Sequence, residues 1–245
     1  MGGNTLPQQR RGKGSKVYVS LDFYSAGDLS LRKYDDIEKN DKIKGVVVDI
    51  IKDRAHFAPL AKVKFEDGSE ILIPAVEGIY VGKEIYSGIN APIENGNILP
   101  LIKIPEGSKI CMIEKYPGDG GKFVRTSGTS AILVQKTENY AIVKLPSGKI
   151  KKINIYSRAI LGVVAGGGRV DKPFVKAGNK YYYMKSKHRY WPVSKPIARN
   201  AADHPFGGKH KRNKGGITPL PKHGYPIKYG KYGSRRTGRR EGSSD

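Results

Sequence analysis

The sequence of 245 residues predicts an all-β fold, with two small barrels in tandem and irregular basic extensions at both ends. Short runs rich in β-branched residues recur between turn signals, which is typical of small barrels whose closure removes exposed strand edges. The chain contains 31 glycines and 15 prolines, a proportion that argues against a helical bundle. A hydrophobic content of 38% is low for a single compact globule, which favours extended segments beside small cores.

The first barrel is predicted over residues 41–92, after a basic N-terminal extension over residues 1–40 that a partner would order. Its first strand is long and contains Gly45, where we expect a bulge or bend. Asp67 and Gly68 form a recognisable hairpin turn between the alternating segment 61–65 and the returning segment 70–73. The expected strand segments are residues 43–51, 61–65, 70–73 and 78–86, the last as a bent strand or a strand pair.

The second barrel is predicted over residues 93–165, after a turn-rich segment that marks the boundary. Its clearest strands are residues 131–135 and 140–145, and the turn at Ser147-Gly148 predicts a hairpin. The expected strand segments are residues 97–101, 109–114, 122–125, 131–135, 140–145, 149–153 and 159–164.

The region from residue 166 to residue 245 has no sustained apolar period, so we expect an irregular basic extension with one short helix near residues 175–185. An irregular segment of this length is unusual inside an ordinary domain. It becomes reasonable if the chain threads through another macromolecule.

The formal net charge is +23, with a sequence pI near 9.9. Most of this surplus lies late in the chain, because residues 169–245 contain 20 Lys and Arg against four Asp and Glu. Such a surplus opposes compaction unless an anionic partner neutralises it. The basic residues alternate with Gly, Pro, Tyr and Asn rather than with Leu and Phe at helical spacing, so nucleic acid is favoured over a membrane surface.

Several other classes of protein fit the sequence poorly. No apolar run approaches the roughly 18 residues that a membrane span requires, and the N-terminus lacks an apolar signal core. The single cysteine, Cys111, excludes an internal disulfide framework. The five histidines show no metal-ligand spacing, so we expect no metal and no cofactor.

Two glycine clusters resemble phosphate loops only superficially. Gly120-Gly121-Lys122 lacks the Ser or Thr and the first glycine of a P-loop, which argues against nucleotide hydrolysis. Gly166, Gly167 and Gly168 precede Arg169 and form either a tight turn or a backbone that approaches a phosphate chain closely. The charge of the surrounding sequence favours close approach to phosphates.

His204 follows Asp203, a pairing that fixes an imidazole tautomer in many catalytic bases. No Ser or Cys nucleophile lies nearby, so a histidine hydrogen-bonded to RNA is the preferred interpretation. A hydrolase that uses Asp203 and His204 is an alternative, and it predicts turnover by the isolated protein that His204→Ala abolishes.

Aromatic residues of the C-terminal region alternate with cations. Tyr181, Tyr182, Tyr183 and Trp191 lie among Lys and Arg, an arrangement that suits base stacking at ~1–3 kcal/mol for each base. Residues 234–240 form a compact run of arginines that suits a phosphate clamp, a nuclear-import signal or a solvated tail.

Many short motifs, in the same order along nearly the whole chain, resemble the L2 (L-two) family of large-subunit ribosomal proteins. Phe206 and residues 114–119 look closer to the eukaryotic cytosolic branch of that family than to the bacterial one. The matching segments are residues 9–15, 43–47, 58–61, 96–100, 105–107, 127–128, 144–148, 162–173, 176–179, 191–192, 203–208 and 235–239.

The resemblance implies an oligonucleotide-binding-type barrel, then an SH3-like barrel, then an extension into large-subunit rRNA. It implies a structural protein near the peptidyl-transferase centre that supports subunit association, tRNA binding and peptide-bond formation, with no enzymatic activity of its own. The implied partners are rRNA and neighbouring ribosomal proteins, with tRNA and the small subunit as indirect partners. The implied location is the cytoplasmic ribosome after nucleolar assembly, with no membrane and no second copy of the chain.

With this resemblance, a set of residues is expected to contact rRNA through phosphate neutralisation, close backbone approach, stacking or hydrogen bonding. His204 also matches a family histidine with a possible supporting role in peptidyl transfer. A free-standing RNA-binding protein or chaperone of the same fold is the other alternative. The expected contact residues are Arg10, Arg11, Lys13, Gly166, Gly167, Gly168, Arg169, Lys172, Lys176, Asn179, Trp191, Asn200, His204, Gly207, Gly208, Arg235, Arg236 and Arg239.

Overall fold

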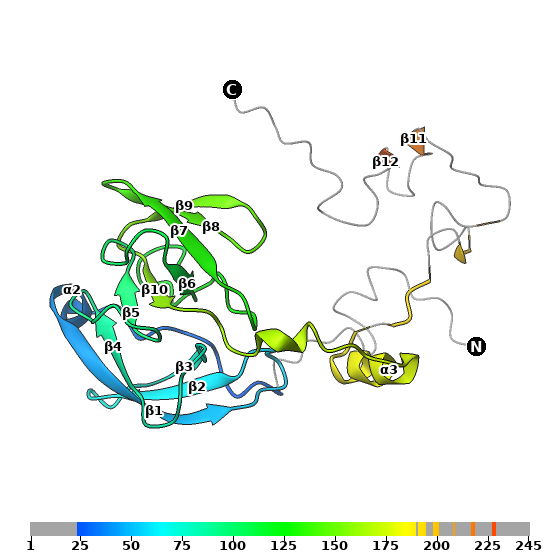
Figure 1. The fold of residues 1–245 in the computed structure, drawn as a ribbon, viewed down its shortest axis with the longest axis horizontal. Helices are drawn as coiled ribbons and strands as arrows, with labels where there is room; N and C mark the ends of the chain where they lie inside the picture. Colours follow the sequence, from blue (N-terminus) through cyan, green and yellow to red (C-terminus); the bar gives the residue numbers. More distant parts are fainter. Residues whose placement is uncertain are drawn as a thin grey trace. The chain divides into compact units, whose positions relative to one another are not determined.

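The all-β prediction is confirmed by a computed structural model, which contains ten strands in one hydrogen-bonded network (Figure 1). The structure describes residues 24–189, 191–194, 198–200, 208, 217–218 and 227–228. The chain divides into two compact units, Met1–Arg189 and Tyr190–Asp245. All ten strands of the network belong to the first unit.

The first half of the network has the order β3-β2-β1-β4. The predicted hairpin is confirmed, since the two strands that flank Asp67 and Gly68 pair in register from Leu60↔Pro74 to Lys64↔Glu70. Alternation places one face of each strand in the core, as the buried and exposed positions of β2 show. The strands are β1 Lys42–Ile51, β2 Leu60–Phe65, β3 Glu70–Pro74 and β4 Glu84–Gly88.

Two expectations for this half need correction. The irregularity in β1 lies between Val47 and Asp49, not at Gly45. Gly45 instead makes room for an aromatic ring, because a Cβ atom there would lie 2.8 Å from Cδ1 of Phe65. The expected strand over residues 78–86 begins only at Glu84, because the preceding residues form turns.

The second half has the order β5-β10-β6-β7-β8-β9, and the hairpin at Ser147-Gly148 is confirmed by the pairing of β8 with β9. The expected strand over residues 122–125 is wrong, because only a single bridge, Ile113↔Phe123, forms there. The strands are β5 Ile98–Pro100, β6 Lys109–Cys111, β7 Ala131–Lys136, β8 Tyr140–Lys144, β9 Ile150–Asn154 and β10 Arg158–Leu161.

The two halves join through one parallel strand pair, Ser87↔Ile98, between β4 and β5, and through the isolated antiparallel bridge Val76↔Val164. The protein has two apolar clusters: one is built mainly from the first half but includes Cys111, Met112 and Ile160 of the second, and the other lies mainly in the second half. Strand β5 serves both, because Ile98 packs in the first cluster and Leu99 in the second. Successive side chains of a strand point to opposite faces, so one strand can contribute to two cores.

Residues 29–40 differ from the expected extension, because they pack on the barrels. Leu29 and Leu31 are 6% and 3% exposed, and Leu29 bridges to Leu72 of β3 in parallel. The short helix α2, Asp36–Asn40, begins at an N-cap in which the Asp35 carboxylate accepts a hydrogen bond from the Glu38 backbone amide. Apolar residues two positions apart allow this segment to bury one face.

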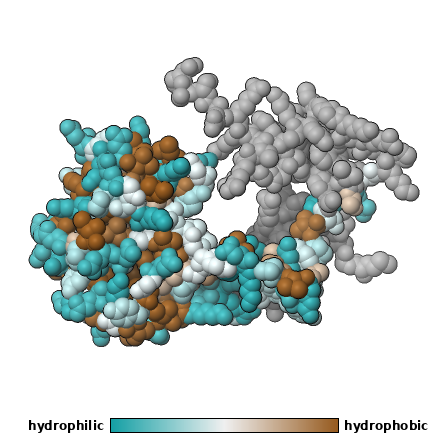
Figure 2. Space-filling model, viewed as in Figure 1, coloured by the Kyte–Doolittle hydropathy of each residue, from teal (hydrophilic) through white to brown (hydrophobic). Residues whose placement is uncertain are grey.

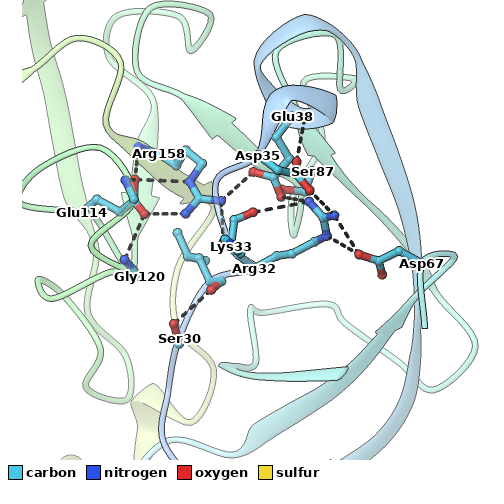
Figure 3. Close-up of polar contacts among 12 residues, drawn as sticks. Ser30, Arg32, Lys33, Asp35, Glu38, Asp67, Ser87, Glu114, Gly120 and Arg158 are labelled. Atoms are coloured by element: carbon cyan, nitrogen blue, oxygen red, sulfur yellow. Dashed lines mark hydrogen bonds and ion pairs between the residues drawn. The ribbon is translucent and has the colours of Figure 1, made fainter. Parts of the chain in front are cut away.

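A network of buried charges joins this N-terminal segment to both halves (Figure 3). The Arg158 guanidinium lies 2.6 Å from Oε1 of Glu114 and 2.5 Å from Oε2 of Glu38. Arg32 pairs with Glu38 and with Asp67, the latter at 2.7 Å. Buried charges require partners of opposite sign, so these contacts constrain how the three segments assemble.

The chain then continues through a short 3₁₀ helix, η2 Gly167–Arg169, into α3, Ala177–Ser186 (Figure 1). Helix α3 confirms the prediction of a short helix near residues 175–185. In the second unit, the two-residue strands β11 Ile217–Thr218 and β12 Ile227–Lys228 pair in antiparallel. Within the described ranges, no helix combines the length and the apolar character that a membrane span needs.

Candidate nucleic-acid interface

The glycine run after β10 forms the tight turn that leads into η2. Gly166 adopts φ +79° as the N-cap of η2, a conformation that L side chains rarely adopt. The backbone at Gly128 packs so tightly against Gly167 that a Cβ atom at Gly128 would lie 2.4 Å from the Gly167 Cα. A Cβ at Gly168, in contrast, would meet no atom within 4 Å. Gly167 thus supports packing within the protein, while Gly168 leaves open space for a ligand backbone.

Arg169, at the end of η2, is held by two hydroxyl groups. Its Nε donates to Oγ of Ser127 at 3.2 Å, and its Nη1 donates to the hydroxyl oxygen of Tyr183 at 3.4 Å. Ser127 is 4% exposed, whereas Arg169 is exposed. The guanidinium is therefore anchored on the protein side and open on the solvent side, as a phosphate-binding arginine requires.

Helix α3 has no core-facing side, since none of its residues is buried. Between Lys172 and Arg189 the sequence contains six Lys and Arg and no Asp or Glu. Tyr181 and Tyr182 are 44% and 68% exposed, and their rings lie 5.4 Å apart, edge to face. A helix of ten residues is marginal in isolation and is usually stabilised by tertiary packing. Helix α3 has little such packing, because none of its residues is buried.

Hydrophobic residues form separate groups among hydrophilic ones on the face of the molecule that Figure 2 shows. Exposed apolar side chains of β1, such as Val46 and Val48, alternate with inward-facing residues and are 36% and 48% exposed. Scattered exposed hydrophobic residues are normal on protein surfaces. The exposed cations of residues 169–189 are thus the more distinctive surface feature.

Lys172 and Lys176, two of the predicted contact residues, are exposed, and neither forms an ion pair in the part of the chain that the structure describes. Asn179 has a structural contact, because its Nδ2 donates to the Phe174 carbonyl at 2.9 Å. In the second unit, Trp191 is half-buried and Asn200 is exposed.

Gly208 has φ +97°, and its backbone amide donates to the Arg199 carbonyl at 3.2 Å. The remaining predicted contact residues lie outside the described residues, so their roles stay predictions. They are Arg10, Arg11, Lys13, His204, Gly207, Arg235, Arg236 and Arg239.

Three residues of this surface received no role from the sequence: Phe57, Ser127 and Gly128. The Phe57 ring lies 4.2 Å from the Arg169 guanidinium carbon, and Ser127 and Gly128 position η2 as described above. Ser127 and Gly128 belong to the motifs that carry the family resemblance, which was the available signal. A lone phenylalanine in a turn carries no such signal, because its neighbours come from distant segments.

Comparison with known proteins adds independent information. Residues 5–87 match the family model described as "Ribosomal Proteins L2, RNA binding N-terminal domain", and residues 94–224 match "Ribosomal Proteins L2, C-terminal domain". The chain is 49% identical to the large ribosomal subunit protein uL2 of Nanoarchaeum equitans over 98% of this chain and 99% of that protein.

Two further archaeal proteins of the same name show similar likeness. The Haloarcula marismortui protein is 48% identical over 97% of this chain and 98% of its own length. The Methanocaldococcus jannaschii protein is 46% identical over 98% of this chain and 100% of its own length. Two domain models that together match most of the chain, and relatives that match nearly its full length, show that the chain belongs to the ribosomal protein L2 family.

Proposed function

We propose that this chain is a structural constituent of the large ribosomal subunit and that it binds and stabilises large-subunit rRNA. The observation that carries the proposal is the segment from Lys172 to Arg189, which contains six cations and no acid and includes helix α3, none of whose residues is buried. Family membership and the match of residues 5–87 to an RNA-binding domain model support it.

RNA would supply both the negative charges and the packing surface that residues 172–189 need. Phosphates neutralise the cations and release counterions, which makes the affinity depend strongly on salt. The RNA surface also covers the helix α3, whose side chains have no protein core to pack against. In this proposal the barrels, over residues 41–92 and 93–165, dock on folded rRNA, and residues 166–245 pass between its helices.

The finer elements of the proposal extend the family resemblance. The chain lies near the peptidyl-transferase centre and supports subunit association, tRNA binding and peptide-bond formation without being an enzyme. It contacts neighbouring ribosomal proteins rather than a second copy of itself. Its place is the ribosome in the cytoplasm, and nucleolar assembly applies only in a cell that has a nucleolus, whereas the relatives compared above are archaeal.

A salt-dependence experiment tests the rRNA contact. Affinity of the full chain for large-subunit rRNA is measured over a series of KCl concentrations. Replacing Lys172, Lys176 and Lys185 by Met should lower the slope of log affinity against log salt by roughly 2–3, since each phosphate contact contributes about 0.7–0.9. An unchanged slope contradicts the proposal.

The matched control replaces three lysines that are already ion-paired: Lys39 with Asp36, Lys44 with Glu84 and Lys62 with Glu70. Both triple variants lose the same formal charge, so a difference between them reports location rather than total charge. We expect the control to change the slope less than the Lys172, Lys176 and Lys185 variant does.

Co-sedimentation with large subunits after a high-salt wash separates a ribosomal constituent from an RNA chaperone that works elsewhere. A constituent stays with the particle, whereas a chaperone leaves. Loss of the chain from washed subunits would favour the chaperone.

A further inference from the structure

Three cations converge on the ring of Phe57, which lies in the loop before β2. The Arg169 Cζ atom is 4.2 Å, the Lys187 Nζ atom 4.7 Å and the Arg189 Cζ atom 5.8 Å from the ring centroid. The negative face of an aromatic ring attracts cations within about 6 Å. One half-buried ring thus gathers charges from η2 and from the residues that follow α3.

Arg54 adds a fourth cation to this cluster. Its guanidinium carbon lies 4.5 Å from the Tyr24 ring centroid, and its backbone carbonyl accepts a hydrogen bond from Lys187 Nζ. We call Arg54, Phe57, Arg169, Lys187 and Arg189 the Phe57 cluster.

Acidic groups that could neutralise the cluster are scarce in the part of the chain that the structure describes. Across the described ranges, none of its four cations forms an ion pair with a carboxylate. Burial, together with Arg169, Arg54 and Arg189, lowers the pKa of Lys187 below its ordinary value, partly offset by Asp53. The like charges therefore repel one another in the absence of a ligand.

The carboxylate of Asp53, the acid beside the cluster, already accepts hydrogen bonds from other groups. It is 1% exposed and accepts hydrogen bonds from the backbone amides of Ala26 and His56 at 3.3 and 3.2 Å. It also contacts the His56 ring and the Ser25 hydroxyl. Because these bonds hold it inside the loop, its charge offsets at most one of the four cations.

Two of the four cations, Arg169 and Lys187, are positioned by hydrogen bonds within the protein. Arg169 is hydrogen-bonded to buried Ser127, Lys187 is hydrogen-bonded to a backbone carbonyl, and the close packing of Gly128 on Gly167 fixes the turn before Arg169. A preorganised site loses little conformational freedom on binding.

We propose that the Phe57 cluster is a binding site for closely spaced phosphates of the rRNA backbone, in which the phenyl ring positions cations instead of stacking on a base. This proposal rests on the proposed function, because rRNA supplies the phosphates. The cluster has four cations, and Asp53 offsets at most one of them. Neutralisation of the remaining charge therefore requires more than one phosphate. The ring face that a base would need is occupied by guanidinium and ammonium groups, whereas exposed Tyr182 remains suited to base stacking.

The first experiment measures the affinity of the full chain for large-subunit rRNA against KCl concentration. The double variant Arg169→Met/Lys187→Met should lower the slope of log affinity against log salt by about 1.4–1.8, for two lost phosphate contacts. The matched control is Lys39→Met/Lys44→Met, which also removes two charges: the Lys39 ammonium lies over a ring, 5.7 Å from the Tyr34 centroid, but is paired with Asp36, and Lys44 is paired with Glu84. A slope equal to that of the control would overturn the proposal.

A second pair of variants tests the ring. Phe57→Leu keeps an apolar side chain but removes the aromatic face, so rRNA affinity should fall about threefold or more. Phe57→Tyr retains the face and should bind like the wild type. Equal binding by Phe57→Leu and wild type would show that the ring does not position the cations.

A third measurement separates this proposal from the proposed function. Tripolyphosphate is titrated into the rRNA-free full chain by calorimetry. Arg169→Met/Lys187→Met should bind less tripolyphosphate than the control Lys39→Met/Lys44→Met, whether or not the wild type binds rRNA. If the wild type bound no rRNA but the tripolyphosphate difference persisted, the proposed function would fail and the phosphate site would stand. Equal binding of tripolyphosphate by both variants would show that the Phe57 cluster is not a phosphate-binding site.

Discussion

Arg158 of β10 and Glu114 form an ion pair that is almost completely shielded from solvent. Nη2 of Arg158 lies 2.6 Å from Oε1 of Glu114, and their side chains are 1% and 0% exposed. The Arg158 backbone amide also donates to Oε2 of Glu114 at 2.9 Å, and the Gly120 amide donates to Oε1 at 3.0 Å. Figure 3 shows Arg158 between Glu114 and the segment that carries Arg32 and Glu38. One guanidinium thus holds the N-terminal segment and the second half together.

Replacing Arg158 by Met should destabilise the chain strongly, because the buried Glu114 carboxylate then loses its ion-pair partner and the buried Glu38 carboxylate keeps only Arg32. We expect the free energy of unfolding to fall by about 3–5 kcal/mol. Urea denaturation followed by fluorescence measures this loss. Lys44→Met, which breaks the exposed pair with Glu84, is the control and should change stability little. Similar losses in both variants would contradict a special role for the buried pair.

The contact between Arg32 and Asp35 predicts an acid-dependent contribution to stability. The hydrogen-bonded Arg32 guanidinium lowers the pKa of Asp35 from 3.8 to about 2. Because the folded-state pKa is the lower one, the contribution is present above the unfolded pKa and is lost as the pH falls from about 4 to about 2. Asp35→Asn keeps an N-cap side chain for α2 but removes the charge.

The measurement is the free energy of unfolding of wild type and Asp35→Asn between pH 2 and 7. The difference between them should be constant above about pH 5 and should shrink toward pH 2. Parallel curves over the whole range would show that the Asp35 charge contributes nothing.

Gly128→Ala should damage the packing of the turn at Gly166 to Gly168. A Cβ atom at Gly128 would lie 2.4 Å from the Gly167 Cα, and Gly128 has φ +70°. Gly148→Ala is the control for backbone strain, because Gly148 has φ +82° but a Cβ there meets no atom within 4 Å. Both should lose about 1–2 kcal/mol from the positive φ, with about 1–3 kcal/mol more for Gly128→Ala from the clash. Chemical denaturation measures the free energy of unfolding of both variants. Equal losses in Gly128→Ala and Gly148→Ala would show that the contact with Gly167 adds no cost.

Cys111 should be unreactive in the folded chain. It is completely buried in β6, and burial raises the pKa of its thiol to about 12. The thiolate is the reactive form, so iodoacetamide at pH 8 should label the native protein far more slowly than the protein in urea. Since the sequence has one cysteine, the modification reports a single site. Native labelling at the rate of a free thiol would show that β6 opens readily.

The hairpins were predictable from the sequence because their signals are local. The alternation of β2, the apolar residues of β3 and the Asp67-Gly68 turn lie within 15 residues, and the structure reproduces that pairing. The segments 78–83 and 122–125 were not predictable in the same way. Both contain apolar residues whose burial depends on distant strands, and periodicity over so few residues does not reveal whether a partner strand is present.

Part of the candidate site was also predictable. The glycine run and the basic character of residues 166–189 are readable in the sequence, and the structure gives Arg169 an exposed, anchored position. The role of Phe57 was not readable, because its three cations come from residues more than 100 positions away. Contacts between such distant residues exist only after the barrels have formed.

By itself the sequence determined the β-rich character, the basic C-terminal third and the family, because these depend on composition, local alternation and ordered motifs. The tertiary structure decided which charges are neutralised inside the protein and which are left for a partner. Arg158 and Arg32 are paired with the carboxylates of Glu38, Glu114 and Asp67, whereas Arg169, Lys187 and Arg189 share one aromatic ring and form no ion pair within the described ranges. Electrostatic energy depends on distance and burial, and both of these quantities arise only when distant segments pack together.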